Sequence, residues 1–284
     1  MKRSWGGKIA SRRVAATAAA ALGVAVSGAA RAADATPLAS PQAEAPSGWI
    51  ATVGGTAVLS PRYAGAEKYG LSGLPSLSFR RPGTPLEFSA PDDGLDYTLY
   101  GTPAFKFGPV ANLRPGRSAG IDARLSGLDN YHWTVEAGAF AEYWPVPNVL
   151  RTRFELMHGV SSHDGFVANV SADLVHKFSA FTLSGGPRLA LADAGVMEVE
   201  FGVRPLAALR NGLVPPFDPR GGVKSAGYEI ALSYDWSDQW RTTVFQRYDR
   251  LVGDAAASPI TRRFGSPDQF TVGLGANYSF ALRY

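Results

Sequence analysis

The segment from Phe270 to Tyr284 constrains the fold more than any other part of the chain. Apolar side chains fill every second position of this segment: Phe270, Val272, Leu274, Ala276, Tyr278, Phe280, Leu282 and Tyr284. Strict alternation places these side chains on one face of a β-strand, where they could meet hydrocarbon. Transmembrane β-barrels typically end in such a strand, which can pair by β-augmentation with barrel-assembly machinery. The predicted assembly signal comprises the last four apolar positions, Tyr278, Phe280, Leu282 and Tyr284.

Alternation with a period of two also runs through most of the chain after Gly48, and no convincing 3.6-residue period accompanies it. Several apolar faces begin or end in Trp or Tyr, as in the pairs Trp133 and Tyr143, Tyr228 and Trp236, and Trp240 and Tyr248. Aromatic ends around a small or aliphatic middle are typical of the interfacial girdles of a lipid band. A soluble β-sandwich would alternate too, but its apolar face would be aliphatic throughout, so it stays the alternative fold.

The pattern predicts an all-β fold, a transmembrane antiparallel up-and-down β-barrel of about 12 strands, with 10 or 14 as alternatives. The predicted strands cover residues 48–60, 68–81, 85–91, 95–101, 102–114, 131–144, 148–160, 165–178, 179–192, 223–237, 239–252 and 268–284. The stretch 85–101 carries the weakest pattern, and the alternating run 196–203 falls inside a long loop. From residue 102 onward, short and long connections take alternate places, as periplasmic turns and outer loops do in bacterial barrels.

The N-terminal segment has the three parts of a secretory signal peptide. A basic start is followed by an Ala-rich apolar stretch and by small residues, with Ala30 and Ala32 in the A-x-A arrangement. We expect Sec-type export with cleavage near Ala32. The apolar stretch is shorter than the roughly 20 residues of a transmembrane helix, although an uncleaved anchor is the alternative. The predicted division is a signal peptide at 1–32, a flexible periplasmic tether at 33–47 and the barrel at 48–284, located in the outer membrane of a Gram-negative cell.

The charge balance does not indicate a nucleic-acid partner. The formal net charge is +4, but residues 1–32 contain six Lys and Arg and no acid, so cleavage would leave a net charge of −2. The basic balance therefore belongs to the leader and not to a binding surface. Because the chain has no Cys, disulfides, thiolate catalysis and Cys-based zinc sites are excluded. No cofactor-binding motif is present, since the glycine pairs 185–186 and 221–222 precede no predicted helix that could bind phosphate.

Charged side chains occupy the faces opposite the apolar ones and would point into the lumen. The candidate cluster comprises Glu136, Glu142, Arg151, Arg153, Glu155, Asp173 and Lys177, and later strands add Glu229, Asp235, Arg241, Arg247 and Asp249. A barrel of about twelve strands is narrow and largely filled by side chains. Opposite charges on neighbouring strands should then form ion-pair ladders. The alternative is that these charges line a selective pore for small solutes.

The sequence Ser161-Ser162-His163-Asp164 invites comparison with a hydrolase. Adjacent residues on one loop cannot form a triad, because nucleophile, base and orienting group must converge in space. His158 or His132 could be a distant partner, but neither G-x-S-x-G nor H-E-x-x-H is present. A polar loop is the simpler interpretation, and no catalytic, cofactor-binding or metal-binding residue is predicted.

Several segments spread over the predicted barrel resemble the MipA/OmpV family of outer-membrane proteins, the family of the MltA-interacting protein. The matching segments are Ser60–Gly65 with Tyr69, Leu74-Pro75, Gly138–Tyr143, Phe201–Val203, Gly253–Ile260 and Gly265–Gln269. Their order and spacing carry the resemblance, since no single piece is decisive. The chain departs from the usual pattern at Ala66 and Lys68, where acidic residues often occur.

The resemblance implies an outer-membrane barrel without a catalytic motif. The founding member looks like a scaffold between a lytic murein transglycosylase and a murein synthase, so the same role is the first functional prediction. A small-solute channel is the alternative, and an outer-membrane hydrolase is a distant third. The expected partners are outer-membrane lipid and lipopolysaccharide, the barrel-assembly machinery and those two murein enzymes.

Overall fold

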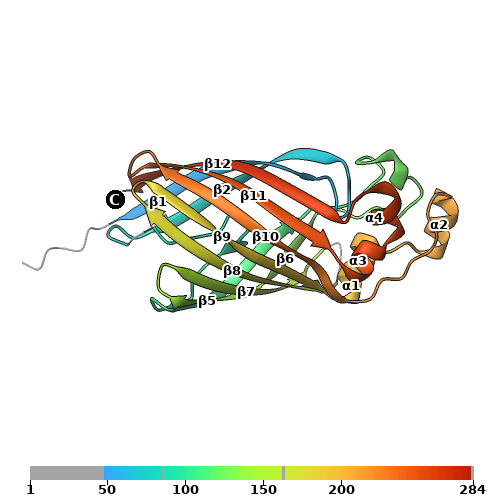
Figure 1. Ribbon diagram of the computed structural model, residues 1–284, viewed down its shortest axis with the longest axis horizontal. Helices are drawn as coiled ribbons and strands as arrows, with labels where there is room; N and C mark the ends of the chain where they lie inside the picture. The colour runs from blue at the N-terminus through green and yellow to red at the C-terminus, as the bar shows by residue number, and fades with distance from the viewer. Residues whose placement is uncertain (1–47, 85, 162–163, 283–284) are drawn as a thin grey trace, which may run out of the picture. The chain divides into compact units, whose positions relative to one another are not determined.

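The computed structural model describes residues 48–84, 86–161 and 164–282. The predicted signal peptide with Ala30 and Ala32, the predicted tether and the terminal Tyr284 lie outside the described residues. From residue 48 the chain forms a single antiparallel sheet that curls around a lumen (Figure 1). Most turns are short at one end of the sheet, here called the turn end. Long connections that include short helices lie at the other, here called the loop end.

The all-β antiparallel architecture predicted from the sequence is confirmed. The strands of the described residues are β1 (Trp49–Pro61), β2 (Tyr69–Arg80), β3 (Leu95–Asp96), β4 (Tyr100–Gly101), β5 (Phe105–Arg114), β6 (Thr134–Val146), β7 (Leu150–Gly159), β8 (Phe166–Phe178), β9 (Phe181–Ala192), β10 (Gly222–Asp235), β11 (Trp240–Leu251) and β12 (Asp268–Leu282). Their order in the sheet is β2-β1-β12-β11-β10-β9-β8-β7-β6-β5-β3, and β4 also pairs with β5. The first long strand therefore pairs with the last, with Val53 opposite Tyr278.

Alternation sorts the side chains of the strands into two faces. On β6 and β7 most of the lumen-facing residues are buried, whereas Val135, Phe154 and Leu156 on the opposite face are exposed. An apolar face that is exposed over so many strands is the face a barrel turns to lipid. Aromatic rings also gather near the turn end. Phe178 stacks on Phe181 with ring centroids 5.4 Å apart, and Trp240 lies 4.8 Å from Tyr278.

The strand predicted at 85–91 is wrong. Residues 86–90 have no strand structure, and the strand predicted at 95–101 is reduced to β3 and β4, two residues each. Residues 86–94 instead run inside the lumen, and we call them the plug. Consequently the described strands leave one seam in the wall, because β2 pairs with β1 alone and β3 pairs with β5 alone. Pro75 lies in the middle of β2, a position that an edge strand tolerates because its missing N–H need not bond a neighbour.

Short helices occupy the long connections, and the sequence pattern did not predict these helices. They are η1 (Ala123–Leu125), α1 (Ala194–Phe201), α2 (Pro205–Asn211), α3 (Gly253–Ala257) and α4 (Pro259–Phe264). The alternating run 196–203 lies in a long connection as expected, but most of it is helix α1, whose N-terminus is capped by the Asp193 carboxylate at 3.0 Å from the Val196 amide. None of the described helices has the length and apolar character needed to cross a membrane.

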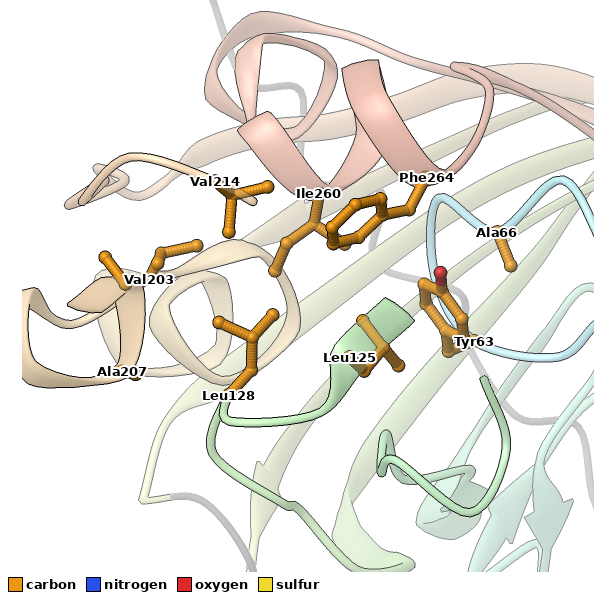
Figure 2. Packing of buried hydrophobic residues seen from close by; sticks show 10 residues of the cluster. Tyr63, Ala66, Leu125, Leu128, Val203, Ala207, Val214, Ile260 and Phe264 are labelled. Carbon is orange, nitrogen blue, oxygen red and sulfur yellow. The ribbon is translucent and has the colours of Figure 1, made fainter. Parts of the chain in front are cut away.

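The helices and loops pack into a cap with its own hydrophobic core (Figure 2). Tyr63 and Ala66 from the β1–β2 loop, Leu125 and Leu128 from the β5–β6 loop, Val203, Ala207, Ala208 and Val214 from the β9–β10 loop, and Ile260 and Phe264 from α4 form one buried cluster. A second cluster joins Val196, Met197 and Phe201 of α1 to Leu251 and Ala255. Connections far apart in the sequence are thus held together as one folded layer over the loop end.

Candidate functional site: the ion-pair network of the lumen

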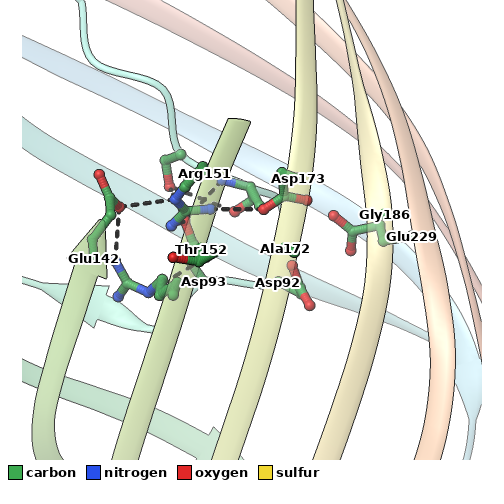
Figure 3. A network of polar contacts seen from close by, with 12 residues as sticks. Asp92, Asp93, Glu142, Arg151, Thr152, Ala172, Asp173, Gly186 and Glu229 are labelled. Carbon is green, nitrogen blue, oxygen red and sulfur yellow. Dashed lines mark hydrogen bonds and ion pairs between the residues drawn. The ribbon is translucent and has the colours of Figure 1, made fainter. Parts of the chain in front are cut away.

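The centre of the lumen is organised around Arg151, whose side chain is fully buried (Figure 3). Its guanidinium donates to Asp93 at 2.6 Å, to Glu142 at 2.9 Å and to Asp173 at 3.1 Å. Glu142 and Asp173 come from the neighbouring strands β6 and β8, so this part of the network is a cross-strand ladder. A buried guanidinium needs such compensation, because an unpaired charge at that depth would be strongly destabilising.

Arg153 forms a second node on the same face of β7. Its guanidinium lies 2.7 Å from the Asp96 carboxylate and 2.9 Å from that of Glu155. The guanidinium carbon also lies over the Phe140 ring, 4.2 Å from its centroid, where the negative face of the ring attracts a cation. Arg151 and Arg153 therefore share their surroundings with acids from the wall and from the chain between β2 and β5.

A third node joins the plug to the far wall. Asp92 accepts hydrogen bonds from Arg188 of β9 at 2.8 and 3.1 Å and from Arg247 of β11 at 2.7 Å. Arg188 also reaches Asp173 at 2.8 Å and Glu229 at 3.3 Å. Arg247 is paired in addition with Asp249 at 2.6 Å. One plug carboxylate thus connects two strands that lie on either side of β10.

Local chemistry explains how the plug presents two adjacent carboxylates. The sequence Ala90-Pro91-Asp92-Asp93 forms a turn in which the Asp93 amide donates to the Ala90 carbonyl at 3.1 Å. The Asp93 carboxylate in turn accepts from the Ala90 amide at 2.8 Å, which is the backbone-capping use of Asp in turns. Before the turn, Phe88 packs edge-on against Trp144 of β6 with centroids 6.1 Å apart. The plug is therefore anchored by apolar and ionic contacts together.

A separate network lies where the lumen meets the cap. Glu136 accepts from Arg114 at 3.0 Å, and Arg114 also reaches Glu200 of α1 at 2.7 Å. Lys224 of β10 lies 3.2 Å from Glu200. Burial alone raises the pKa of Glu200, but the charges of Lys224 and Arg114 outweigh burial and lower this pKa to about 2. The cap is therefore fastened to the wall by a carboxylate that stays charged.

The structure brings together most of the charged cluster predicted from the sequence. Glu142, Arg151, Arg153, Glu155 and Asp173 are buried and joined in the network of the lumen. Glu136 is buried in the separate network at the cap, and Lys177 is exposed near the turn end of β8, outside both networks. Of the later charges, Glu229, Arg247 and Asp249 join the network through Arg188 and Asp92. Asp235 and Arg241 form a separate pair 2.5 Å apart near the turn end. In the assembly signal, Tyr278, Phe280 and Leu282 belong to β12.

Sequence reasoning missed the residues that close the network. Arg188 has the lumen parity of β9 and could have been found from the same alternation that identified Arg151. Asp92 and Asp93 carried only a turn signature, which gives no sign that the turn lies inside the lumen. A cavity lined by Asp92, Arg153 and Arg188 has a volume of about 30 Å³, enough for about one water molecule.

The residues proposed for hydrolase chemistry do not form a catalytic arrangement in the described part of the chain. The His158 ring lies 2.9 Å from the Asp164 carboxylate, whose side chain is 97% exposed. Ser162 and His163 lie outside the described residues. Among the residues that are described, no group of three or more His, Asp or Glu side chains is placed to hold a metal ion.

Comparisons with known proteins place this geometry in a family. The family model described as MltA-interacting protein MipA matches residues 53–280, which cover nearly the whole described sheet. A search of curated proteins found no match. Solved structures similar to the chain include the KdgM porin, with 13% identity over 82% of this chain and 99% of that chain and a TM-score of 0.36. The toluene transporter TodX of Pseudomonas putida has 11% identity over 83% of this chain and 90% of that one, with a TM-score of 0.34.

The family match spans far more than half of the chain, and it agrees with the resemblance seen in the sequence. Together with the curled antiparallel sheet and its exposed apolar face, it assigns the protein to the outer membrane. The chain therefore belongs to the MltA-interacting protein (MipA) family and is an outer-membrane β-barrel protein.

Proposed function

We propose that this barrel is a non-enzymatic scaffold that holds murein-processing enzymes at the inner surface of the outer membrane. In this proposal a lytic murein transglycosylase and a murein synthase dock at the turn end or on the tether at 33–47. The name of the matched family, which refers to interaction with the transglycosylase MltA, supports this choice of partner. A leader cleaved near Ala32 would deliver the chain to the periplasm.

The observation that carries the proposal is the closure of the lumen. Arg151 and its three carboxylates fill the centre, and the cap core covers the loop end. Side chains committed to buried ion pairs are not free to catalyse, and side chains that occupy the centre of a lumen obstruct the passage of solutes. The surface that is left for partners is then the rim of the barrel. At the turn end the rim includes Trp236, which is 67% exposed.

The orientation follows from the lengths of the connections. Short connections join β6 to β7, β8 to β9 and β10 to β11, and long ones lie at the opposite end. Bacterial outer-membrane barrels turn their short connections toward the periplasm, so the turn end is the one that murein enzymes could reach. The exposed apolar face would contact membrane lipid and lipopolysaccharide, and β12 would present the signal to the assembly machinery. The surface carries no feature that we assign to nucleic acid.

A pull-down tests the scaffold. The purified full-length mature barrel is immobilised in detergent and exposed to a lytic murein transglycosylase from the same cell. We expect recovery to fall at least about tenfold, which corresponds to about 1.4 kcal/mol of binding, when 33–47 is deleted or when Trp236→Ser is introduced. The matched control is Leu209→Ser, which replaces an exposed apolar side chain of the cap, and it should bind as wild type does. Equal recovery by all variants would contradict the proposal.

A small-solute channel is the second candidate, favoured by one feature of the wall. On β1, β2 and β12 many of the lumen-facing residues are small and uncharged, among them Gly54, Ser72 and Ser76. The lumen on that side is bounded by hydroxyl groups and glycine instead of by ion pairs, and closure depends on the plug. Steady, reproducible current steps from the purified barrel in a planar bilayer would support the channel, and a silent bilayer would support the closed scaffold.

A further inference from the structure

The plug occupies the place in the chain where an ascending wall strand is missing. β2 runs from the loop end to the turn end, since it is antiparallel to β1. β3 and β4 run in the same sense, because both are antiparallel to β5. The intervening residues must therefore climb back toward the loop end, and they do so through the lumen. In an up-and-down barrel that climb is made by a strand of the wall.

The wall has a matching open position. In the described chain no strand pairs with the second edge of β2 or with the outer edge of β3 and β4. An open sheet edge within hydrocarbon leaves backbone N–H and C=O groups without partners, which a bilayer does not tolerate. The plug residues Leu86, Phe88 and Ala90 alternate with Glu87 and Ser89, as a strand between lipid and lumen requires. The segment thus has the composition to fill the open position.

Inside the lumen, the plug is held mainly by an arginine quartet, Arg151, Arg153, Arg188 and Arg247. Asp92 accepts two hydrogen bonds from Arg188 and one from Arg247. Asp93 binds Arg151 at 2.6 Å and lies 3.6 Å from Arg153. All four arginines come from wall strands, whereas the two aspartates come from the plug. The plug therefore places two adjacent carboxylates in a pocket of guanidinium groups that the wall provides.

Guanidinium groups arranged in this way recognise carboxylates in general. Their planar N–H donors match the two oxygens of a carboxylate, as the paired Arg188 contacts with Asp92 show. If the plug leaves, Arg188 keeps Asp173 and Glu229, and Arg247 keeps Asp249. Each arginine of the quartet would nevertheless lose one carboxylate, so donors would be left pointing into the vacated space. A small soluble molecule with two or more carboxylates could satisfy those donors in place of Asp92 and Asp93.

We propose that the arginine quartet is a binding site for solutes with several carboxylates, filled at rest by Asp92 and Asp93. In this proposal a bound solute displaces the plug, which moves to the open wall position beside β2 and closes the seam. The site goes beyond the scaffold role and does not depend on it. Displacement opens the lumen only while the solute is present. A barrel that is closed at rest is therefore consistent with the scaffold function and with the carboxylate site.

Thiol labelling follows the plug directly, because the chain contains no native Cys. Ala90 is 4% exposed at the turn of the plug, so an Ala90→Cys side chain should react slowly with a membrane-impermeant maleimide while the plug is seated. We expect potassium citrate to accelerate labelling at least about tenfold over potassium chloride of equal ionic strength. Chloride screens the ion pairs to the same extent but lacks paired carboxylate oxygens. Equal rates in the two salts would overturn the proposal.

A second variant separates the site from its intrinsic ligand. In Ala90→Cys with Asp92→Asn and Asp93→Asn, labelling should be fast without citrate, and calorimetry should detect citrate binding more tightly than in wild type. The matched control is Glu87→Gln, which removes a carboxylate of the same segment whose partner is Lys106 at 2.7 Å and not the quartet. Its labelling should stay slow. Citrate binding that is absent from the double Asn variant would also overturn the proposal.

Two measurements keep a negative result interpretable. The fraction of barrel that migrates anomalously on a gel until it is boiled reports whether each variant is folded. If the double Asn variant does not fold, the comparison of citrate with chloride in Ala90→Cys alone still decides. Recovery of the transglycosylase is measured on the same preparations. If the transglycosylase is not recovered but citrate binds, the scaffold proposal fails and the carboxylate site stands. If the transglycosylase is recovered but citrate does not bind, the carboxylate site fails and the scaffold proposal stands.

Discussion

Arg188 and Asp92 are joined by two hydrogen bonds of 2.8 and 3.1 Å, although 96 residues separate them in the chain. Arg188 belongs to a wall strand and Asp92 to the plug, so this pair attaches a segment without regular secondary structure to the sheet. Two charge-assisted hydrogen bonds in parallel give direction as well as strength. The pair therefore determines where the plug sits, and the remaining contacts of the network build on that position.

Replacing Arg151 should destabilise the barrel more than any other substitution of a charged residue in the wall. Arg151→Met removes the cation shared by Asp93, Glu142 and Asp173 and leaves three buried carboxylates without it. The free energy of unfolding should fall by about 3–5 kcal/mol. Urea unfolding in lipid vesicles measures this loss. Lys177→Met, at an exposed position, is the control and should change stability by less than about 0.5 kcal/mol.

The cap should unfold independently of the barrel. Phe264→Ala opens a cavity in the cap core, which should cost about 3–5 kcal/mol of local stability. Trypsin should then cleave at Arg262 or Arg263 faster than in the wild type, while anomalous gel migration of the uncleaved barrel is kept. Simultaneous loss of both properties would mean that cap and barrel form one cooperative unit.

The attachment of α1 should weaken in acid. The pKa of Glu200 is lowered to about 2 in the folded protein, so the unfolded chain binds a proton at higher pH than the folded one. The stabilisation is complete above the ordinary Glu pKa of about 4.3 and is lost as pH falls toward 2. Hydrogen exchange of the α1 amides, corrected for intrinsic rates, should accelerate over that range. In Glu200→Gln this pH dependence should disappear, and a persistent dependence would assign it to another group.

The end of β12 should control assembly more than stability. Phe280→Ser places a polar group on the lipid-facing side of β12, where the assembly signal is predicted. We expect a smaller fraction of heat-modifiable barrel in the outer-membrane fraction of cells. Asn277→Ser, on the lumen-facing side of the same strand, is the matched control. Equal yields from both variants would show that the apolar face of this strand carries no signal.

The alternation of polar and apolar residues predicted the wall apart from the stretch 85–101. On β6, β7 and β8 it placed Glu142, Arg151 and Asp173 on one face, and the observed register brings the three side chains into contact. The prediction failed for Lys177 because alternation gives the face of the strand on which a residue lies but not its position along the barrel axis. That residue shares the face of Asp173 but lies at the exposed end of its strand.

The plug and the helices could not be predicted from local pattern for different physical reasons. Residues 86–90 alternate like a strand. Their place in the lumen depends on the ion pairs that the neighbouring Asp92 and Asp93 form with arginines 155 and 58 positions away in the chain. In α1 the residues Val196, Met197, Glu200 and Phe201 are buried with the spacing of one helix face. One of them is a charged Glu, so the hydropathy of the segment has no helical period and only the two-residue alternation is apparent in the sequence.

In the orientation that we propose, the shared core of the cap has a consequence for recognition of this protein from outside the cell. Because Tyr63, Leu125, Val203 and Phe264 belong to four different connections, the surface above them is a discontinuous epitope. An antibody or phage that binds the intact cap contacts several segments of the chain at once. A synthetic peptide copied from one connection would lack the neighbours that hold its shape, so immunisation with such peptides selects antibodies against a conformation that living cells do not display.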